Sequence, residues 1–287
     1  MSTIVVTGAT GNVGRHIIPA LAEQGHTVRA LVRDPDRAAL PRGVTAVRGD
    51  LADPGTLEPA LRGADGVYLM WPGLPVRPRV VELIAEHTER VVYLSTDVPD
   101  LADGEPPAVF HQEIERQIRN SGLAWTFVRA IDFATNTLAW ADRIRQGVVR
   151  LPYGRAARSL IHERDIAEVA VRALTTDGHD GAAYLITGPE SIPQAELVRI
   201  IGEETGITAR WEELPVETAR EQLAAAWGSA EFADARLRAW ASFVDTPERV
   251  TDTVERLLGR PARTFRSWAR EHADDFRRPP GDRSAAP

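Results

Sequence analysis

A glycine-rich turn near the start of the chain constrains its fold more than any other feature. The apolar pair VV leads into TGATGNVG, and an apolar-periodic segment begins directly after it. Such a turn joins a first β-strand to a helix around a dinucleotide pyrophosphate, because the phosphates must approach the main chain and meet free N–H groups at the helix start. A strand-to-helix turn that binds no ligand can have the same glycine pattern, so the strands that follow must distinguish the two alternatives. The residues expected to contact the pyrophosphate are Gly8, Thr10, Gly11, Asn12, Val13 and Gly14.

The end of a second apolar strand, HTVRALVR at residues 26–33, is where the adenosine ribose would lie. An arginine there would pair with the 2′-phosphate of NADP, whereas an acidic residue would accept hydrogen bonds from the ribose hydroxyls of NAD. Arg33 stands directly at the strand end, with Arg37 nearby, and Asp34 follows it. This order favours NADP(H), while Asp34 keeps NAD(H) open.

A third strand is expected to end at RGDL, residues 48–51. In a doubly wound sheet, Asp50 and Leu51 would then meet the edge and the face of the adenine. The glycine turn, the arginine and this segment follow one another in the order that a nucleotide-binding lobe requires, so together they predict nucleotide binding.

Helical and strand patterns continue to alternate after this point, which predicts an α/β fold: a Rossmann-type, doubly wound parallel sheet. Residues 182–189 could add another strand to the sheet. The remaining strands are expected at residues 66–72, 90–97 and 123–130, and an amphipathic helix at 163–174.

Beyond Pro189 the sequence changes to helices with short connections, which predicts a smaller, mainly helical substrate lobe. We expect the nucleotide lobe to comprise residues 1–132 and 160–188, and the substrate lobe to comprise residues 133–159 and 189–276. The Pro- and charge-rich tail at 277–287 is expected to be disordered.

Two missing residue types exclude several kinds of chemistry. The chain has no cysteine, which excludes disulfides and thiol catalysis, and all of its 34 Lys+Arg residues are arginine. Without lysine there is no Tyr-x-x-x-Lys pair to lower a tyrosine pKa, no Schiff base and no Walker lysine. Any reduction must therefore use another acid or none.

Charge and hydropathy set expectations about partners and location. The formal net charge of −7 argues against nucleic-acid binding, and no apolar run is long enough to span a membrane. No secretion signal is evident, so we expect a cytoplasmic protein. His162 and Glu163 have no third ligand nearby, so no metal site is expected.

Ligands of such folds gather at the carboxyl ends of the strands. Trp71 and Ser95 are expected to contact the cofactor there, and a substrate is expected against Trp71, Asp132, Phe133 and Asn136. The aromatic residues of the helical lobe, such as Trp211, Trp227 and Trp240, would either line a pocket for a flat ring or fill the core of the lobe.

The chain resembles the NmrA-like, atypical short-chain dehydrogenases, which include bacterial NAD(P)H quinone reductases and plant phenylpropanoid reductases. The resemblance spans most of the sequence. It is carried by TGATGNVG, the LVRDP after the second strand, GDL at 49–51, the segment from His111 to Gly122, WTFVRAIDFATN and ERDIAEVA. It implies an NADPH-preferring nucleotide lobe, with the substrate over the nicotinamide between the two lobes.

The resemblance also implies catalytic residues. A catalytic lysine of the plant reductases corresponds to His111, and the quinone reductases are similar to this chain in having histidine there, so His111 is the first candidate for a proton donor. The alternative is an ordinary surface or N-cap role. Ser95 and Thr96 stand where related enzymes orient the substrate carbonyl; they could equally cap the next loop.

These features predict hydride transfer from NAD(P)H to a quinone or a conjugated aromatic carbonyl, because a delocalised hydroquinone anion needs little help from an acid. By analogy with relatives, the substrate would be an anthraquinone-type intermediate of aromatic polyketide and antibiotic biosynthesis, reduced as part of an oxygen-dependent hydroxylation with a partner protein. Two alternatives stay open: a non-catalytic, NAD(P)-sensing regulator that binds a protein partner, and a simple ketone or enone reductase.

Overall fold

The structure is a computed structural model that describes residues 1–101, 105–107 and 109–278. Two compact units form within the chain. Unit 1 comprises Met1–Ile131, Glu163–Ile186 and Thr253–Pro261, and unit 2 comprises Asp132–His162, Thr187–Asp252 and Ala262–Pro287. The expected tail at 277–287 lies almost entirely outside the described residues.

A seven-stranded sheet forms the centre of unit 1, with the order β3-β2-β1-β4-β5-β6-β9. Every neighbouring pair is parallel. The predicted doubly wound, Rossmann-type sheet is therefore confirmed, and the strand expected at 182–189 joins the sheet beside β6. The strands are β1 Thr3–Val6, β2 Thr27–Val32, β3 Thr45–Arg48, β4 Gly66–Met70, β5 Arg90–Thr96, β6 Ala124–Ala130 and β9 Ala182–Ile186.

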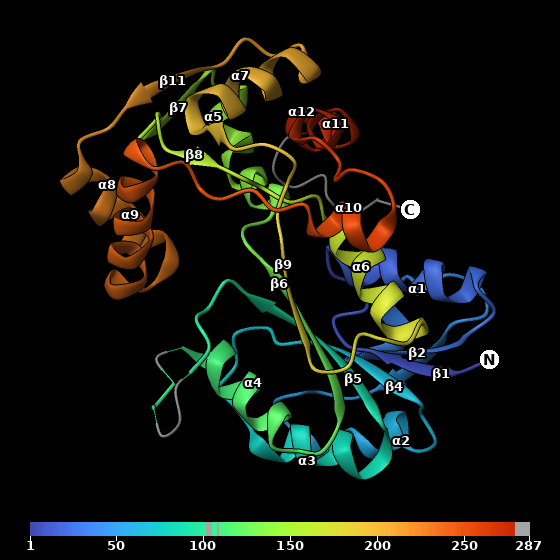
Figure 1. The fold of residues 1–287 in the computed structure, drawn as a ribbon. Coiled ribbons are helices and arrows are strands. Elements are labelled where there is room, and N and C mark those ends of the chain that lie inside the picture. Colours follow the sequence, from blue (N-terminus) through green and yellow to red (C-terminus); the bar gives the residue numbers. More distant parts are fainter. Residues whose placement is uncertain (102–104, 108, 279–287) are drawn as a thin grey trace. The chain divides into compact units, whose positions relative to one another are not determined.

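Helices cover both faces of this sheet, as Figure 1 shows. On one face α1 (Gly14–Glu23) packs against α6 (Glu163–Thr175), and α10 (Thr253–Leu258) packs on α6 and β9. The other face carries α2 (Glu58–Leu61), α3 (Pro78–His87) and α4 (Phe110–Arg119). Short 3₁₀ turns follow β2 at Pro35–Arg37 and β3 at Pro54–Thr56.

The central strands read as nearly continuous apolar runs because both of their faces are buried. In β5, for example, Val91, Val92 and Tyr93 are fully buried in succession. Alternate residues face the α3 and α4 side, where Val67, Tyr93 and Phe127 belong to one apolar cluster. The carboxyl ends of the strands then present their loops at one edge of the sheet.

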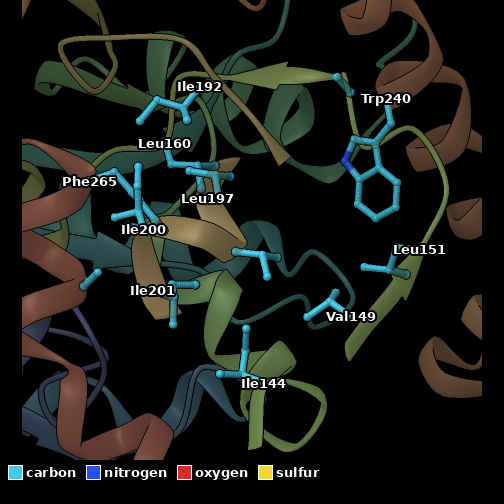
Figure 2. Close-up of a cluster of buried hydrophobic side chains, with 14 of the residues drawn as sticks. Ile144, Val149, Leu151, Leu160, Ile192, Leu197, Ile200, Ile201, Trp240 and Phe265 are labelled. Carbon is cyan, nitrogen blue, oxygen red and sulfur yellow. The ribbon is translucent and has the colours of Figure 1, made fainter. Parts of the chain in front are cut away.

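Unit 2 is mainly helical and has a core of its own, part of which Figure 2 shows. It contains two small sheets, β7 with β11 and β8 with β10. Its elements are η3 Ala134–Trp140, α5 Ala141–Arg145, β7 Val148–Leu151, β8 Ala157–Arg158, β10 Ile192–Pro193, α7 Gln194–Thr205, β11 Arg210–Glu213, α8 Val216–Trp227, α9 Ala230–Asp245, α11 Phe265–Glu271 and α12 Ala273–Arg277.

The boundaries of the units differ from the expected lobes in one informative way. Residues 253–261 were expected in the substrate lobe, but α10 lies in unit 1. Arg260, next to this helix, donates to Asp165 at 2.7 Å and pairs with Glu168, both on α6. Such a long-range ion pair leaves no signal in the local sequence pattern.

Trp240 of α9 is buried in the core of unit 2, whereas Trp227 is 40% exposed. Of the two alternatives for the aromatic residues of this lobe, a pocket for a ring or a filled core, the second therefore holds for Trp240. Within the described ranges, none of the helices combines the length and the apolar character that crossing a bilayer requires.

Candidate active site

The glycine turn after β1 has the geometry that a close phosphate contact needs. Gly8 adopts a φ of +59°, a conformation that side chains resist, and a Cβ on Gly14 would lie 2.2 Å from the Gly8 carbonyl oxygen. The amide of Gly11 donates to the same carbonyl at 2.9 Å. The start of α1 is thus packed directly on the turn, with no space for side chains between them.

Backbone donors at this turn fit a dinucleotide pyrophosphate. Val13, the N-cap residue of α1, makes no side-chain hydrogen bond to the start of the helix. The N–H groups of a first helical turn lack partners within the helix and carry partial positive charge, which suits a bound anion. Residues Thr10 to Gly14 would hold the pyrophosphate, and Arg15, 46% exposed and 3.6 Å from Glu163, adds a cation beside them.

Two arginines stand together where the ribose was expected. Arg33 follows β2, Arg48 ends β3, and both are exposed. The Arg48 guanidinium donates to the Arg33 carbonyl at 3.1 Å. Asp34 is also exposed and lies at the start of the 3₁₀ turn. Sequence reasoning chose Arg33 and passed over Arg48, although Arg48 directly precedes the GDL motif.

The two residues expected at the adenine have local structural contacts. Asp50 accepts a hydrogen bond from the Ala52 amide at 2.9 Å, and its own amide donates to Thr56. Leu51 is buried in the apolar cluster beneath the sheet. Their contact with adenine stays a prediction.

Trp71 follows β4 and is only 4% exposed. Its indole N–H donates to the Leu74 carbonyl at 2.8 Å, and its ring belongs to the apolar cluster on the α3 side. Little of the side chain is therefore free to contact a ligand, and its expected contacts with cofactor and substrate stay predictions.

His111 lies in the first turn of α4, against β5. Its Nδ1 is 2.8 Å from the hydroxyl of Tyr93, and the two rings are 5.9 Å apart. Phe110 also packs on the imidazole, with its ring centroid 4.1 Å away. Tyr93 has no exposed surface, whereas His111 is half-buried. No tyrosine of this lysine-free chain can have a lysine partner, and the partner of Tyr93 is a histidine.

The surroundings of His111 change the role expected for it. Burial lowers the pKa of His111 to about 4, although the nearby Glu115 opposes the shift. The imidazole is therefore neutral at pH 7, because desolvation disfavours its charged form. The expectation that His111 delivers a proton near neutral pH stays a prediction, and the lowered pKa argues against it. A neutral imidazole still donates one hydrogen bond.

A buried ion network fixes the same helix one turn further along. Ser95 donates to Glu115 at 2.7 Å, and Arg129 donates to both carboxylate oxygens of Glu115, at 3.0 and 2.5 Å. Arg129 and Arg119 also pair with Asp100, at 2.6 and 2.7 Å. Because Glu115 lies four residues after His111, both side chains share the face of α4 that meets the sheet.

The hydroxyls at the end of β5 have protein partners. The Ser95 side chain is 3% exposed and bonded to Glu115, and Thr96 donates to the Ala130 carbonyl at 3.3 Å. Their roles in orienting a substrate stay predictions, as does the contact of Ser95 with the cofactor. In the sequence, Glu115 was noted only as part of the segment from His111 to Gly122 and received no role; its four-residue spacing from His111 was the available signal.

Three of the expected substrate residues lie in unit 2. Asp132 accepts from Arg158 at 2.5 Å, from Arg236 at 3.2 Å and from the side chain of Asn136. Burial pushes the pKa of Asp132 upward, but the two guanidinium groups outweigh it and hold the pKa below its ordinary value. Phe133 forms a parallel bridge with Ile161. Their contact with a substrate stays a prediction. Among the described residues, no cluster of acidic and histidine side chains forms a metal site.

Comparisons with known proteins agree with this geometry. Residues 8–177 match the model of a family described as NAD(P)H-binding. The chain is 41% identical over 282 residues to the (4-alkanoyl-5-oxo-2,5-dihydrofuran-3-yl)methyl phosphate reductase of Streptomyces griseus, covering 95% of this chain and 99% of the relative. It is 36% identical over 282 residues to the NAD(P)H azoreductase of Xenophilus azovorans, with the same coverage of both chains.

Solved structures show the same fold. The NADPH-dependent quinone oxidoreductase of Escherichia coli superposes with a TM-score of 0.75 at 24% identity, covering 93% of this chain and 98% of that one. The family model, the named reductases and the nucleotide-binding geometry of unit 1 agree. The chain belongs to the NAD(P)H-binding, NmrA-like family of atypical short-chain reductases, and it is an NAD(P)H-dependent reductase.

Proposed function

We propose that the protein reduces a conjugated carbonyl compound whose anionic product is delocalised, such as an acylated unsaturated lactone or a quinone. Bound NADPH supplies the hydride. His111 donates a hydrogen bond to the carbonyl oxygen on which negative charge develops, and solvent then supplies the proton that completes the product.

The observation that carries this proposal is the burial of the His111 imidazole, which lies 2.8 Å from the Tyr93 hydroxyl and packs on the ring of Phe110. This burial keeps the imidazole uncharged at pH 7, and the chain contains no lysine to replace it. A neutral N–H stabilises a developing oxyanion but is a poor source of a whole proton.

A neutral hydrogen-bond donor favours some hydride acceptors over others. Hydride addition to a simple ketone leaves a localised, strongly basic alkoxide, which requires an acid in the same step. Addition to a double bond of which one carbon carries two carbonyl groups leaves an anion spread over two oxygens, and reduction of a quinone leaves a phenolate whose charge is shared with the aromatic ring. Such an anion is weakly basic, so a hydrogen bond is enough to stabilise it.

The relatives support the same class. The compound named for the Streptomyces griseus reductase contains a ring double bond conjugated to both an alkanoyl group and a ring carbonyl. The Escherichia coli enzyme is named as a quinone oxidoreductase. An anthraquinone-type polyketide intermediate also belongs to this class; its oxygen-dependent hydroxylation with a partner protein stays a prediction.

We also propose that NADPH is preferred to NADH. Arg33 and Arg48 lie side by side at the ends of neighbouring strands, and both are exposed. Two guanidinium groups at this position suit a 2′-phosphate better than they suit a ribose hydroxyl.

The test is NADPH oxidation with three acceptors: an acylated unsaturated lactone, a naphthoquinone and a simple ketone. We expect turnover with the first two and little with the third. His111→Phe keeps a ring but removes the N–H, and we expect kcat to fall on the order of a hundredfold with unchanged NADPH affinity. His87→Phe, at the far end of α3, is the matched control and should leave kcat unchanged.

Faster reduction of the ketone than of the conjugated acceptors would contradict the proposal. Tight NADPH binding without turnover of any acceptor would also contradict it, and would favour the sensing regulator instead. An unchanged kcat in His111→Phe would show that His111 takes no part in the reaction.

A further inference from the structure

The contact between Tyr93 and His111 restricts where hydrogen atoms can lie. The Tyr93 hydroxyl is fully buried, and in the part of the chain that the structure describes its one hydrogen-bond partner is Nδ1 of His111. Burial raises the pKa of Tyr93 above its ordinary value, so the phenol keeps its proton. The imidazole is neutral and holds one proton on either nitrogen.

Only one of the two hydrogen placements satisfies both groups. If Nδ1 carries the proton, it donates to the Tyr93 oxygen, and the phenolic O–H is left buried without an acceptor. If Tyr93 donates to Nδ1, both atoms are paired. Leaving a buried donor unpaired is costly, so the second placement is favoured.

We propose that Tyr93 is a positioning residue whose hydroxyl donates to Nδ1 of His111 and holds the imidazole in the tautomer that carries its proton on Nε2. His111 then meets the acceptor as a donor of fixed orientation. The inference rests on the proposed function for the identity of the acceptor, but the tautomer itself can be measured without any substrate.

Packing around the pair holds both rings in place. Phe127 meets Tyr93 edge to face at a centroid distance of 6.2 Å, and Phe110 stacks at a tilt of 32° on the imidazole. Glu115, whose charge acts on His111, is engaged by Ser95 and Arg129. The described residues offer Nε2 no protein partner, so its N–H is available to a ligand.

A second buried tyrosine provides a matched control. Tyr68 lies on the neighbouring strand β4 and is fully buried like Tyr93, but its hydroxyl has no partner among the described residues. Tyr68→Phe and Tyr93→Phe therefore remove the same atom from the same sheet, and only the second removes a hydrogen bond. Both variants keep the ring that packs in the core.

The experiment is nitrogen-15 NMR of the histidine-labelled full chain, without substrate, for the wild type, Tyr93→Phe and Tyr68→Phe. His111→Gln identifies the signals of His111 among the 7 histidines. We expect wild-type His111 to show a protonated Nε2 and a bare, hydrogen-bonded Nδ1. In Tyr93→Phe the Nδ1 signal should move to that of a nitrogen without a hydrogen bond, whereas Tyr68→Phe should match the wild type.

A wild-type His111 protonated on Nδ1 would overturn the inference, and so would a Tyr93→Phe spectrum identical to that of the wild type. These results do not depend on turnover, so they are separate from a failure of the proposed function. That failure would instead show as absent reduction of all conjugated acceptors.

Kinetics supply a second readout. We expect Tyr93→Phe to lower kcat about five- to tenfold, the equivalent of one hydrogen bond, while KM changes less than about twofold. Tyr68→Phe should leave both constants unchanged. Equal effects of the two substitutions would assign Tyr93 a merely structural role and overturn the inference.

Discussion

The turn after β1 and the start of α4 both lie at the carboxyl edge of one sheet, but they present different chemical groups there. The turn offers backbone N–H groups, and its shape depends on Gly8 and Gly14, where a side chain has no room. The start of α4 offers an imidazole, held by Tyr93 from β5 and supported by Glu115, Ser95 and Arg129. One site depends on the absence of side chains, the other on several side chains from separate elements.

This difference predicts different responses to mutation. A change in the turn should affect cofactor binding directly, because the donors are part of the main chain. A change in the buried network of α4 should act first on stability and on the placement of His111. The two kinds of effect can be separated by measuring affinity, stability and kcat on the same variants.

The largest effect on stability is expected from Glu115→Gln. It removes the charge that faces the buried guanidinium of Arg129, and breaking a buried ion pair from one side costs about 3–5 kcal/mol. Denaturant unfolding should show this loss, with NADPH affinity of the folded protein unchanged. Arg79→Ala, which breaks an exposed pair with Glu86, is the control and should leave the unfolding midpoint unchanged. If Glu115→Gln lowered the free energy of unfolding less than this control does, the ion network around Glu115 would not stabilise the fold.

Gly14→Ala should act on cofactor binding instead. The new Cβ would lie 2.2 Å from the Gly8 carbonyl oxygen, so the start of α1 must move away from the turn. We expect the Kd for NADPH to rise on the order of a hundredfold, roughly 3 kcal/mol. Fluorescence titration measures this, and circular dichroism checks folding. Gly55→Ala, where a Cβ meets only an ordinary contact at 3.4 Å, serves as the control. Unchanged affinity in Gly14→Ala would place the pyrophosphate elsewhere.

A smaller effect is expected from Arg33→Ala and Arg48→Ala. Each should raise the Kd for NADPH about tenfold by removing a charge-assisted hydrogen bond, and leave the Kd for NADH nearly unchanged. Isothermal titration with both cofactors separates these outcomes. Arg62→Ala, which breaks an exposed pair on α2, is the matched surface control. An equal loss for NADH would mean that the two arginines do not discriminate between the cofactors.

The same comparison explains what could be predicted from the sequence. The glycine turn and the parallel sheet follow from local spacing and alternation, so TGATGNVG and the apolar strands were enough to predict them. The contact between Tyr93 and His111 joins residues 18 positions apart, and the pairing of Glu115 with Arg129 joins residues 14 apart. No local periodicity encodes such contacts, although the spacing of His111 and Glu115 on one helix hinted at them.

The state of a titratable group was harder still to predict. His111 was identified as a candidate from its position in the sequence, but its pKa depends on burial, which lowers it, and on the nearby Glu115, which raises it. Likewise, Arg48 gains meaning only because β3 lies beside β2 in the sheet, which brings it to Arg33. In both cases the missing information is which strand or helix is the neighbour.

The proposed reaction depends most on His111 acting as a neutral donor, and the pH dependence of hydride transfer tests this directly. Single-turnover oxidation of NADPH by a naphthoquinone would be followed from about pH 5 to 8, a range that includes the ordinary pKa of histidine. With a pKa of about 4 for His111, the imidazole stays uncharged throughout, so we predict a rate without a step near the ordinary histidine pKa. A rate that falls as the pH rises through about 6.5 in the wild type, and a step that disappears in His111→Phe, would show a protonated acid and contradict the account.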